Sequence, residues 1–420
     1  MALIAHVISQ DDLNGTTSSA IDTTGAKTIF LVVVTLSAVA EPVITDSEGN
    51  YWWQGPGQIM ANGTVMRVWF CADPATSATH TFTATRTGSY PAIAVQAHSG
   101  VLSFLDALDH EDGGAGTVTS RAAGTVTPLS DDDMVLAAWG FGDAGNPTGS
   151  FAIDNGFTAV GFAANSSGNA FGIGHGYKYL SGGKDTALTP TASWSGATAS
   201  DGVVFAYVTS GRSGVFVEDT FVDADTTALQ SHTGELGATW TERTAAADFT
   251  IVNDSAYPPI TGEAIYTASG TPASAEYDVL VQFFQRLIGV GDLSAVARFV
   301  DTDNYYLAQY TGDLTTTGNF RIYKKVGGSF TELAASGTIL VGQGWPPSVR
   351  FRIRDASKKV YVDGTELLTT SDNALTAAGL AGVRGTEQAV VAAMIQVEDA
   401  GGGGGDSGGA RRRRLLLRGG

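Results

Sequence analysis

The first 212 residues alternate short apolar, β-branched stretches with clusters of Gly, Asp, Asn and Pro. Such stretches, from 3–9 and 28–37 through to 203–209, have the length and spacing of β-strands. No window shows the apolar period of about 3.6 residues that marks an amphipathic helix. Regularly spaced short strands with turn residues between them are typical of an antiparallel sandwich or barrel. This half of the chain is therefore predicted to be all β.

The longest apolar run, 29–36 (IFLVVVTL), has eight residues. A membrane-spanning helix needs about 20 apolar residues, so this run predicts a buried strand and no membrane partner is expected. The segment 79–86 (THTFTATR) places threonine at nearly every second position, which suits a half-exposed or intersubunit strand.

The second half shows the strand pattern more clearly. In 348–354 (SVRFRIR) apolar residues alternate with three arginines, so we expect one face in a core and the guanidinium groups in water. The pair Asp363-Gly364 suits a type I′ hairpin turn, in which both central residues have positive φ. By the same reasoning Gly327-Gly328 joins two further strands. A helical turn is expected only near 284–287.

The predicted architecture is two antiparallel, jelly-roll-like β-sandwich domains in series with a flexible Gly/Arg tail. Residues 1–210 form the N-terminal sandwich, and the small, polar residues 211–214 form a linker. Residues 215–399 form the second sandwich. Residues 400–420 are a Gly-rich linker ending in a short Arg/Leu peptide, since consecutive glycines hold no fixed backbone.

Charge and cysteine content narrow the function. The net charge is −18, with 7 Lys and Arg against 18 Asp and Glu in 1–212, and 12 against 23 in 213–400. Acidic bodies repel phosphate backbones and anionic membranes, so neither domain is expected to bind nucleic acid. The single cysteine, Cys71, excludes an intramolecular disulfide and a paired-thiolate zinc site. The N-terminus lacks a basic region before its apolar residues, so no signal peptide is expected.

Several segments of the second half match one family in order. From Asp219 onwards the chain resembles concanavalin-A-like, laminin-G-like sandwich domains of bacteriophage structural proteins and bacterial surface proteins, over about 215–399. The matching segments are 219–241, 297–301, 304–306, 320–325, 361–365 and 379–383. Three segments of the first half, 43–52, 70–72 and 92–101, resemble a phage-type β-sandwich module.

These resemblances imply a non-enzymatic virion structural protein, such as a capsid decoration, head fibre or tail appendage. Its partners would be other virion subunits, further copies of itself and cell-surface glycans. It would be made in the host cytoplasm and would need no cofactor, although calcium is compatible with the fold. Alternatives are a glycan-active hydrolase and a free-standing lectin.

Catalytic chemistry is not expected. The laminarinase-type glycosidases on this fold carry three carboxylates on one strand face, whereas here only Glu276 and Asp278 share a face. The six histidines show no metal-ligand spacing. The resemblance implies a calcium site where the first and last strands of the domain meet, with Glu218, Asp219 and Asp399 as candidate oxygen ligands.

Aromatic residues are candidates for glycan stacking, because an aromatic face offers a flat apolar surface to a sugar ring. The candidates are Trp52, Trp53, Tyr305, Tyr306 and Tyr310. Alternation along a strand puts Trp52 and Trp53 on opposite faces, so one of them points away from the core.

The C-terminal peptide is the one basic patch. It could meet phosphate, remain disordered, or dock onto the acidic body of the same or a sister subunit, with its leucines filling a small groove. We assign it as a candidate assembly tail made of Arg411, Arg412, Arg413, Arg414, Leu415, Leu416, Leu417 and Arg418.

Overall fold

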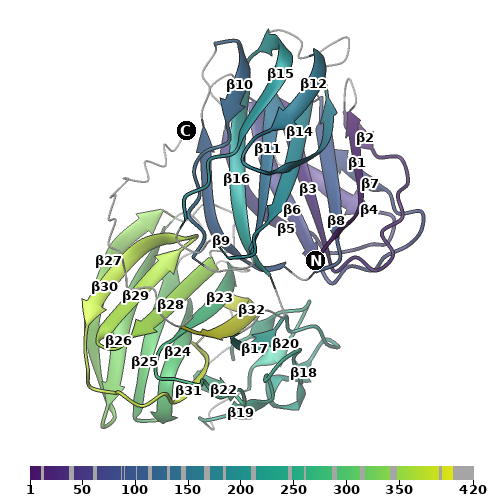
Figure 1. Ribbon diagram of the computed structural model, residues 1–420. Helices are drawn as coiled ribbons and strands as arrows, with labels where there is room; N and C mark the ends of the chain where they lie inside the picture. Colours follow the sequence, from purple (N-terminus) through teal and green to yellow (C-terminus); the bar gives the residue numbers. More distant parts are fainter. Residues whose placement is uncertain are drawn as a thin grey trace. The chain divides into compact units, whose positions relative to one another are not determined.

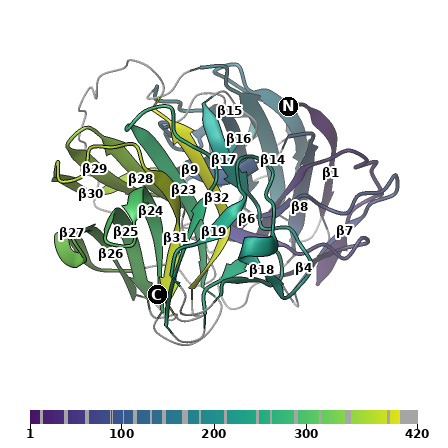
Figure 2. The same cartoon turned by 90° about the horizontal axis from the view of Figure 1, so that it is seen from below.

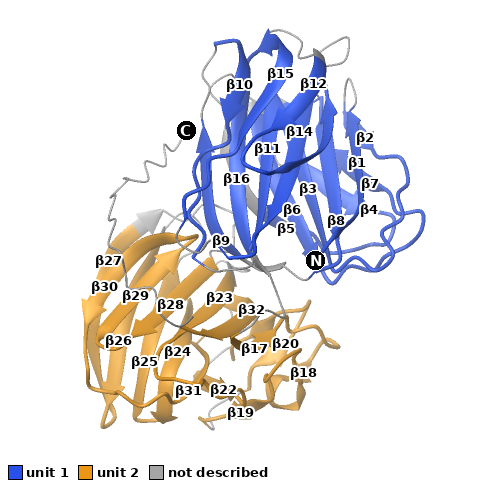
Figure 3. Ribbon diagram, in the orientation of Figure 1, with its two compact units in different colours: residues 1–210 blue, residues 211–420 orange. Residues whose placement is uncertain are grey.

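The computed structural model describes residues 1–10, 14–36, 42–59, 64–86, 88, 90–100, 102–111, 116–129, 133–142, 148–164, 171–182, 186–209, 214–244, 248–259, 262–285, 291–312, 317–340, 348–386 and 390–400. The chain divides into two compact units, unit 1 (residues 1–210) and unit 2 (residues 211–420), coloured separately in Figure 3. The described residues contain β-strands and one 3₁₀ turn, η1 (Leu229–Ser231), in antiparallel sheets (Figure 1). The predicted all-β sandwich class is confirmed. No helix in this part of the chain is long and apolar enough to cross a membrane.

The first half of unit 1 has eight strands in two sheets. One sheet has the order β1-β8-β3-β6-β5 and the other β2-β7-β4. The strands are β1 (Leu3–Gln10), β2 (Gly15–Thr17), β3 (Thr28–Leu36), β4 (Val43–Asp46), β5 (Trp53–Ile59), β6 (Thr64–Ala72), β7 (Phe82–Thr85) and β8 (Ala92–His98). The run predicted to be a buried strand is the central strand β3, whose residues Ile29 to Val34 are at most 1% exposed.

The second half of unit 1 repeats this arrangement. Its sheets have the orders β9-β16-β11-β14-β13 and β10-β15-β12, which match the first half strand for strand when eight is added to each number. The strands are β9 (Leu102–Glu111), β10 (Val118–Ala122), β11 (Met134–Phe141), β12 (Thr148–Ile153), β13 (Thr158–Ala163), β14 (Gly172–Tyr179), β15 (Thr191–Thr198) and β16 (Ser200–Thr209). Unit 1 thus contains two copies of one eight-stranded sandwich, where the sequence predicted a single sandwich.

Each copy has its own apolar core between its two sheets. In the first copy Leu31, Trp69 and Val95 pack with Phe82 of the small sheet. In the second copy Val135, Trp139 and Val204 pack with Trp194. Because side chains alternate along a strand, each five-stranded sheet has a second face that points away from this core and packs on something else.

The two five-stranded sheets of unit 1 meet through a polar and aromatic layer. Gln96 bonds the Nδ1 of His175 at 2.8 Å and His98 at 3.2 Å, and His98 Nδ1 lies 2.5 Å from the hydroxyl of Tyr179. Burial lowers the pKa of both His98 and His175 to about 3, so both imidazoles are neutral. We call Gln96, His98, His175 and Tyr179 the buried polar layer.

Unit 2 is a sandwich of a nine-stranded and a seven-stranded sheet. The first has the order β18-β20-β21-β32-β23-β28-β29-β30 with β17 also paired to β32, and the second β19-β22-β31-β24-β25-β26-β27. The strands are β17 (Val215–Asp219), β18 (Thr227–Ala228), β19 (Trp240–Glu242), β20 (Thr250–Ile251), β21 (Ala256–Tyr257), β22 (Glu263–Ala268), β23 (Tyr277–Gln285), β24 (Gly291–Asp301), β25 (Asn304–Gly312), β26 (Thr317–Val326), β27 (Ser329–Leu340), β28 (Ser348–Arg354), β29 (Ser357–Val362), β30 (Thr365–Ser371), β31 (Leu380–Thr386) and β32 (Val390–Asp399).

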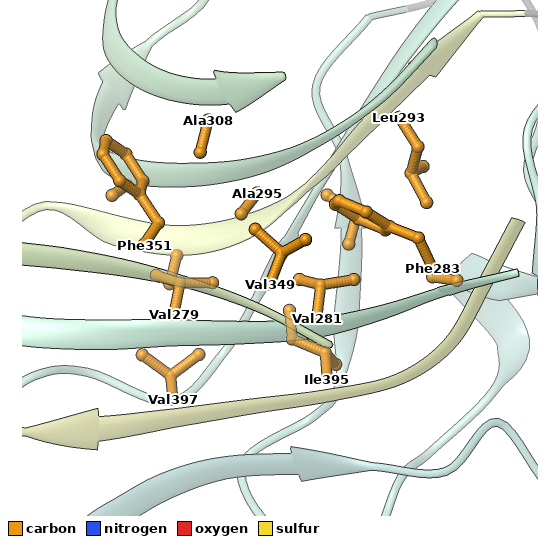
Figure 4. Packing of buried hydrophobic residues seen from close by; sticks show 14 of the residues in the cluster. Val279, Val281, Phe283, Leu293, Ala295, Ala308, Val349, Phe351, Ile395 and Val397 are labelled. Carbon is orange, nitrogen blue, oxygen red and sulfur yellow. The ribbon is translucent and has the colours of Figure 1, made fainter. Parts of the chain in front are cut away.

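The core of unit 2 is built from alternate residues of both sheets. Val279, Val281 and Phe351 of the nine-stranded sheet face Leu293 and Ala295 of the seven-stranded sheet (Figure 4). Strand β28 coincides with the predicted 348–354. The two predicted hairpin turns are confirmed by positive φ, at Asp363 and Gly364 (50° and 78°) and at Gly327 and Gly328 (57° and 81°).

Two local predictions for unit 2 are wrong. Residues 284 and 285 continue strand β23, and 286–287 lie outside the described residues, so no helical turn is described there. Arg350 and Arg352 are buried, at 3% and 5% exposure, and both bond the carboxylate of Asp278. The arginine face of β28 is therefore an internal ion-pair cluster.

Candidate functional site

One face of the seven-stranded sheet of unit 2 carries polar side chains beside a small buried apolar cluster that includes Val296 and Leu307. On β24 and β25, Leu293, Ala295, Tyr306 and Ala308 face the core. The alternate residues of the same strands therefore point the other way. We call this side of β22, β31, β24, β25, β26 and β27 the outer face; Figure 2 shows β24 to β27 side by side.

The strand register sorts the outer face into rows that cross the strands. In one row, every position on six successive strands is polar and at least partly exposed. We call this row the polar track. Its residues, in order across the sheet, are Glu263, Thr386, Asp292, Thr311, Asn319 and Thr338.

Arg384 lies in the neighbouring row and holds two carboxylates of the track. Its Nη2 bonds Glu263 at 2.8 Å, and its Nη1 bonds Asp292 at 2.9 Å. Burial opposes the charge of Arg384, but the two carboxylates outweigh it and keep its pKa above the ordinary value. Burial raises the pKa of Asp292 even beside this guanidinium. The track therefore has a pre-positioned acidic end, with the Glu263 side chain 33% exposed.

Two fully buried polar side chains lie beside Arg384 under the track. Ser294 is the register partner of Arg384 on the adjacent strand. The hydroxyl of Tyr305 interacts with the Arg384 side chain, which opposes the rise that burial causes in the pKa of Tyr305. Both side chains are enclosed, so the surface open to a ligand here is the polar track itself.

An aromatic corner completes the outer face at its β27 edge. Phe330 is 46% exposed, and its ring packs edge-on against Tyr305 and Tyr323 at 6.1 and 6.2 Å between centroids. Lys325 Nζ lies 5.1 Å and the Arg384 guanidinium 5.9 Å from the Phe330 centroid. These cations hold the ring while leaving much of it in solvent.

The predicted aromatic platforms are mostly buried. Tyr306 and Tyr310 are 0% and 2% exposed in the core of unit 2, so neither offers a face to a sugar, and their prediction as stacking residues is wrong. Tyr305 is on the outer face but fully buried, so it offers no ring face to a sugar either. In the described part of unit 2 the exposed aromatic residue is Phe330, which the sequence did not single out.

In unit 1, Trp52 is half-buried against the core of the first sandwich. Its indole N–H donates to Asp46 at 2.6 Å, and its ring meets Phe82 edge-on. Packing and this hydrogen bond account for its position, so Trp52 is a structural residue here. The side chain of Trp53 lies outside the described part of the chain.

The candidate calcium ligands do not come together. The Asp219 carboxylate accepts from Phe221 N–H at 2.7 Å and from Trp240 Nε1 at 2.5 Å, and it pairs with His232. Glu218 and Asp219 pair with Gln396 and Ile395, several residues along β32 from Asp399. Among the described residues no group of three or more His, Cys, Asp and Glu side chains is placed to hold a metal ion.

His232 instead forms a buried clamp at the start of unit 2. Its Nε2 lies 2.9 Å from Asp219 and its Nδ1 3.0 Å from Asp223. Burial opposes protonation, but the two carboxylates outweigh it and raise the pKa of His232 to about 9. The protonated imidazole thus ties η1 to the end of β17.

The carboxylates that the hydrolase alternative needs are not available as a pair. Asp278 is fully buried and pairs with Arg350, Arg352 and Arg354 at 2.9, 3.2 and 2.7 Å. Burial opposes its ionisation, but the three cations hold its pKa well below the usual range. Glu276 lies one residue before β23, and the carboxylate that shares its face, that of Asp278, is held by these three arginines. The assembly-tail residues 411–418 lie outside the described residues.

Comparisons with known proteins show similarity of fold only. No protein-family model matches the chain. No curated protein matches it either. Similar solved structures include a carbohydrate-binding module, CBM66, from Bacillus subtilis, with 16% identity over 41% of this chain and 94% of that chain at a TM-score of 0.30. The CBM2 module of the evolved Dit of Lactobacillus casei BL23 phage J-1 has 11% identity over 45% and 90% at 0.28, and the apo Crh5 transglycosylase 11% over 45% and 85% at 0.31.

Proposed function

We propose that this protein is a non-enzymatic glycan-binding protein whose binding site is the outer face of unit 2. The observation that carries the proposal is the polar track, in which every side chain is at least partly exposed, on the same face as the exposed Phe330 ring. A sugar supplies hydroxyl groups that donate and accept, together with an apolar ring face. The outer face offers hydrogen-bonding side chains for the hydroxyl groups and the Phe330 ring for the apolar face.

Binding without catalysis is favoured by the state of the carboxylates. Glu263 and Asp292 are both held by Arg384, which limits their freedom to act as a separate nucleophile and acid. Bonded carboxylates remain good acceptors for sugar hydroxyls.

We further propose that the chain is a virion structural protein that displays this face for adhesion. The support is the sequence resemblance of both halves to phage-type sandwich modules, together with an acidic, duplicated sandwich that suits presentation. Assembly with other virion subunits and with copies of itself belongs to the same proposal. Mass spectrometry of purified particles tests it: the chain must be found in virions, and its absence from them overturns the virion role.

The glycan-binding proposal is tested on a glycan array with three forms of the full chain. Wild type is expected to bind, and Phe330→Ala is expected to lose about tenfold in affinity because the exposed ring face is removed. Thr369→Ala changes an exposed threonine of the other sheet and is the matched control. Equal binding by wild type and Phe330→Ala, or no binding to any glycan, overturns the proposal.

A further inference from the structure

We infer that the outer face takes an extended, uncharged polysaccharide chain lying across the strands along the polar track; this inference rests on the proposed glycan binding. The track crosses six strands from Glu263 on β22 to Thr338 on β27. Strands in a sheet lie about 4.8 Å apart, so the track is about 24 Å long. A single sugar unit would fill only a fraction of that length.

The composition of the track favours a chain of hydroxyl groups. Four of its six residues are Thr or Asn, whose short side chains donate and accept hydrogen bonds without blocking the surface. The neighbouring row contributes the longer side chains of Arg384, Gln309 and Arg321, which are register neighbours of the track on the same strands. The longer side chains stand higher above the sheet than the short ones of the track, so they form one side of a shallow path along which an extended ligand can align.

Sheet geometry argues against an extended peptide as occupant. The track lies on the face of the sheet, where the backbone N–H and C=O groups are already paired in the ladders. A peptide strand binds a sheet at an unpaired edge, through its main chain. A ligand on the face must bond side chains, which suits a polyhydroxylated chain.

Charge selects the class of polysaccharide. Glu263 and Asp292 share one cation, Arg384, so this end of the track keeps an excess of negative charge. Residues 213–400 as a whole hold 12 Lys and Arg against 23 Asp and Glu. Uronate or sulfate groups would be repelled by such a surface, whereas an uncharged chain is not.

The test is calorimetry of the full chain with uncharged oligosaccharides of the cellulose, xylan, mannan and laminarin series, each as disaccharide and hexasaccharide. In the series that binds, the hexasaccharide is expected to bind at least about tenfold more tightly than the disaccharide. Asn319→Ala with Thr338→Val, at the far end of the track from Glu263, is expected to reduce that ratio to about threefold or less. Thr369→Ala is expected to leave it unchanged.

The outcomes separate the two proposals. Equal affinity for disaccharide and hexasaccharide, with Phe330→Ala still weakening both, overturns the track while the glycan-binding proposal stands. Tighter binding of polygalacturonate than of any uncharged hexasaccharide overturns the choice of ligand class. Absence of binding to every sugar tested overturns the glycan-binding proposal and this inference with it. Circular dichroism of each variant verifies that it is folded.

Discussion

The buried polar layer of unit 1 and the outer face of unit 2 place the same kinds of side chain on a sheet and use them differently. In unit 1, Gln96 and His98 bond residues of the opposing sheet, and both histidines are neutral. On the outer face, charges persist in the Arg384 ion pairs, and every residue of the polar track is at least partly exposed. A polar layer enclosed between two sheets keeps its titratable groups neutral, whereas a partly exposed polar face keeps its charges and can bond a ligand.

The largest expected effect is acid destabilisation of unit 1. The pKa of His98 and of His175 falls from 6.5 to about 3 on burial. Their contribution to the free energy of unfolding is therefore complete above pH 6.5 and is lost as the pH falls towards 3. At pH 4 the loss is about 3 kcal/mol for each imidazole. Hydrogen exchange of unit 1 peptides in urea, corrected for intrinsic rates, measures it. Equal stability at pH 7 and pH 4 would contradict the neutral-histidine account.

Unit 2 is expected to respond in the opposite direction. The pKa of His232 is raised from 6.5 to about 9, so its stabilisation is complete below pH 6.5 and disappears as the pH rises through 9. The loss is about 3 kcal/mol. The measurement is the urea midpoint of unit 2 peptides between pH 6 and 10. His232→Gln should be less stable at pH 6 and should show little of this dependence; a variant that keeps the wild-type slope would exclude His232 as its source.

A tyrosine variant in unit 1 tests the hydrogen bonds of the buried polar layer. Tyr179→Phe leaves His98 Nδ1 without its partner inside the layer, which costs about 1–3 kcal/mol of unfolding free energy. Chemical denaturation of the full chain measures this effect. An unchanged free energy of unfolding in Tyr179→Phe would show that this hydrogen bond does not stabilise unit 1.

The smallest expected effect on stability is that of Phe330→Ala. The ring is 46% exposed at the sheet edge, so its removal should change the free energy of unfolding by about 1 kcal/mol or less. Truncation of the buried Phe82 in unit 1 should cost about 3–5 kcal/mol by comparison. Thermal melts of both variants provide the test, and similar losses would show that Phe330 is a core residue.

Local patterns predicted local structure well. The apolar run 29–36 became the central strand β3, and the alternation in 348–354 became β28 with the predicted bounds. The glycine-containing turns were predictable because positive φ at both central positions restricts the residue types. Which face of a strand would be buried was harder to predict. Alternation separates Tyr305 from Tyr306 but does not say which one faces the core, and it does not reveal that Arg350 meets Asp278.

The candidate site could not be read from any one segment. The polar track joins residues from 263 to 386, and they align only through the register of five strand pairings. A partial signal was present in 320–325 (FRIYKK), where Arg321, Tyr323 and Lys325 alternate with the core residues Phe320 and Ile322. The duplication in unit 1 could not be predicted from the sequence either, because it is visible only in the order of the strands within the sheets.

The repeated sandwich of unit 1 affects where the chain can be divided. Removing residues 102–209 would strip the covering sheet from Phe30, Gln96 and His98, and would leave an apolar surface with broken hydrogen bonds in water. Such a fragment would tend to associate through its bared sheet. Separation between residues 210 and 211 keeps both copies together, so the smallest self-sufficient piece of this half is the tandem.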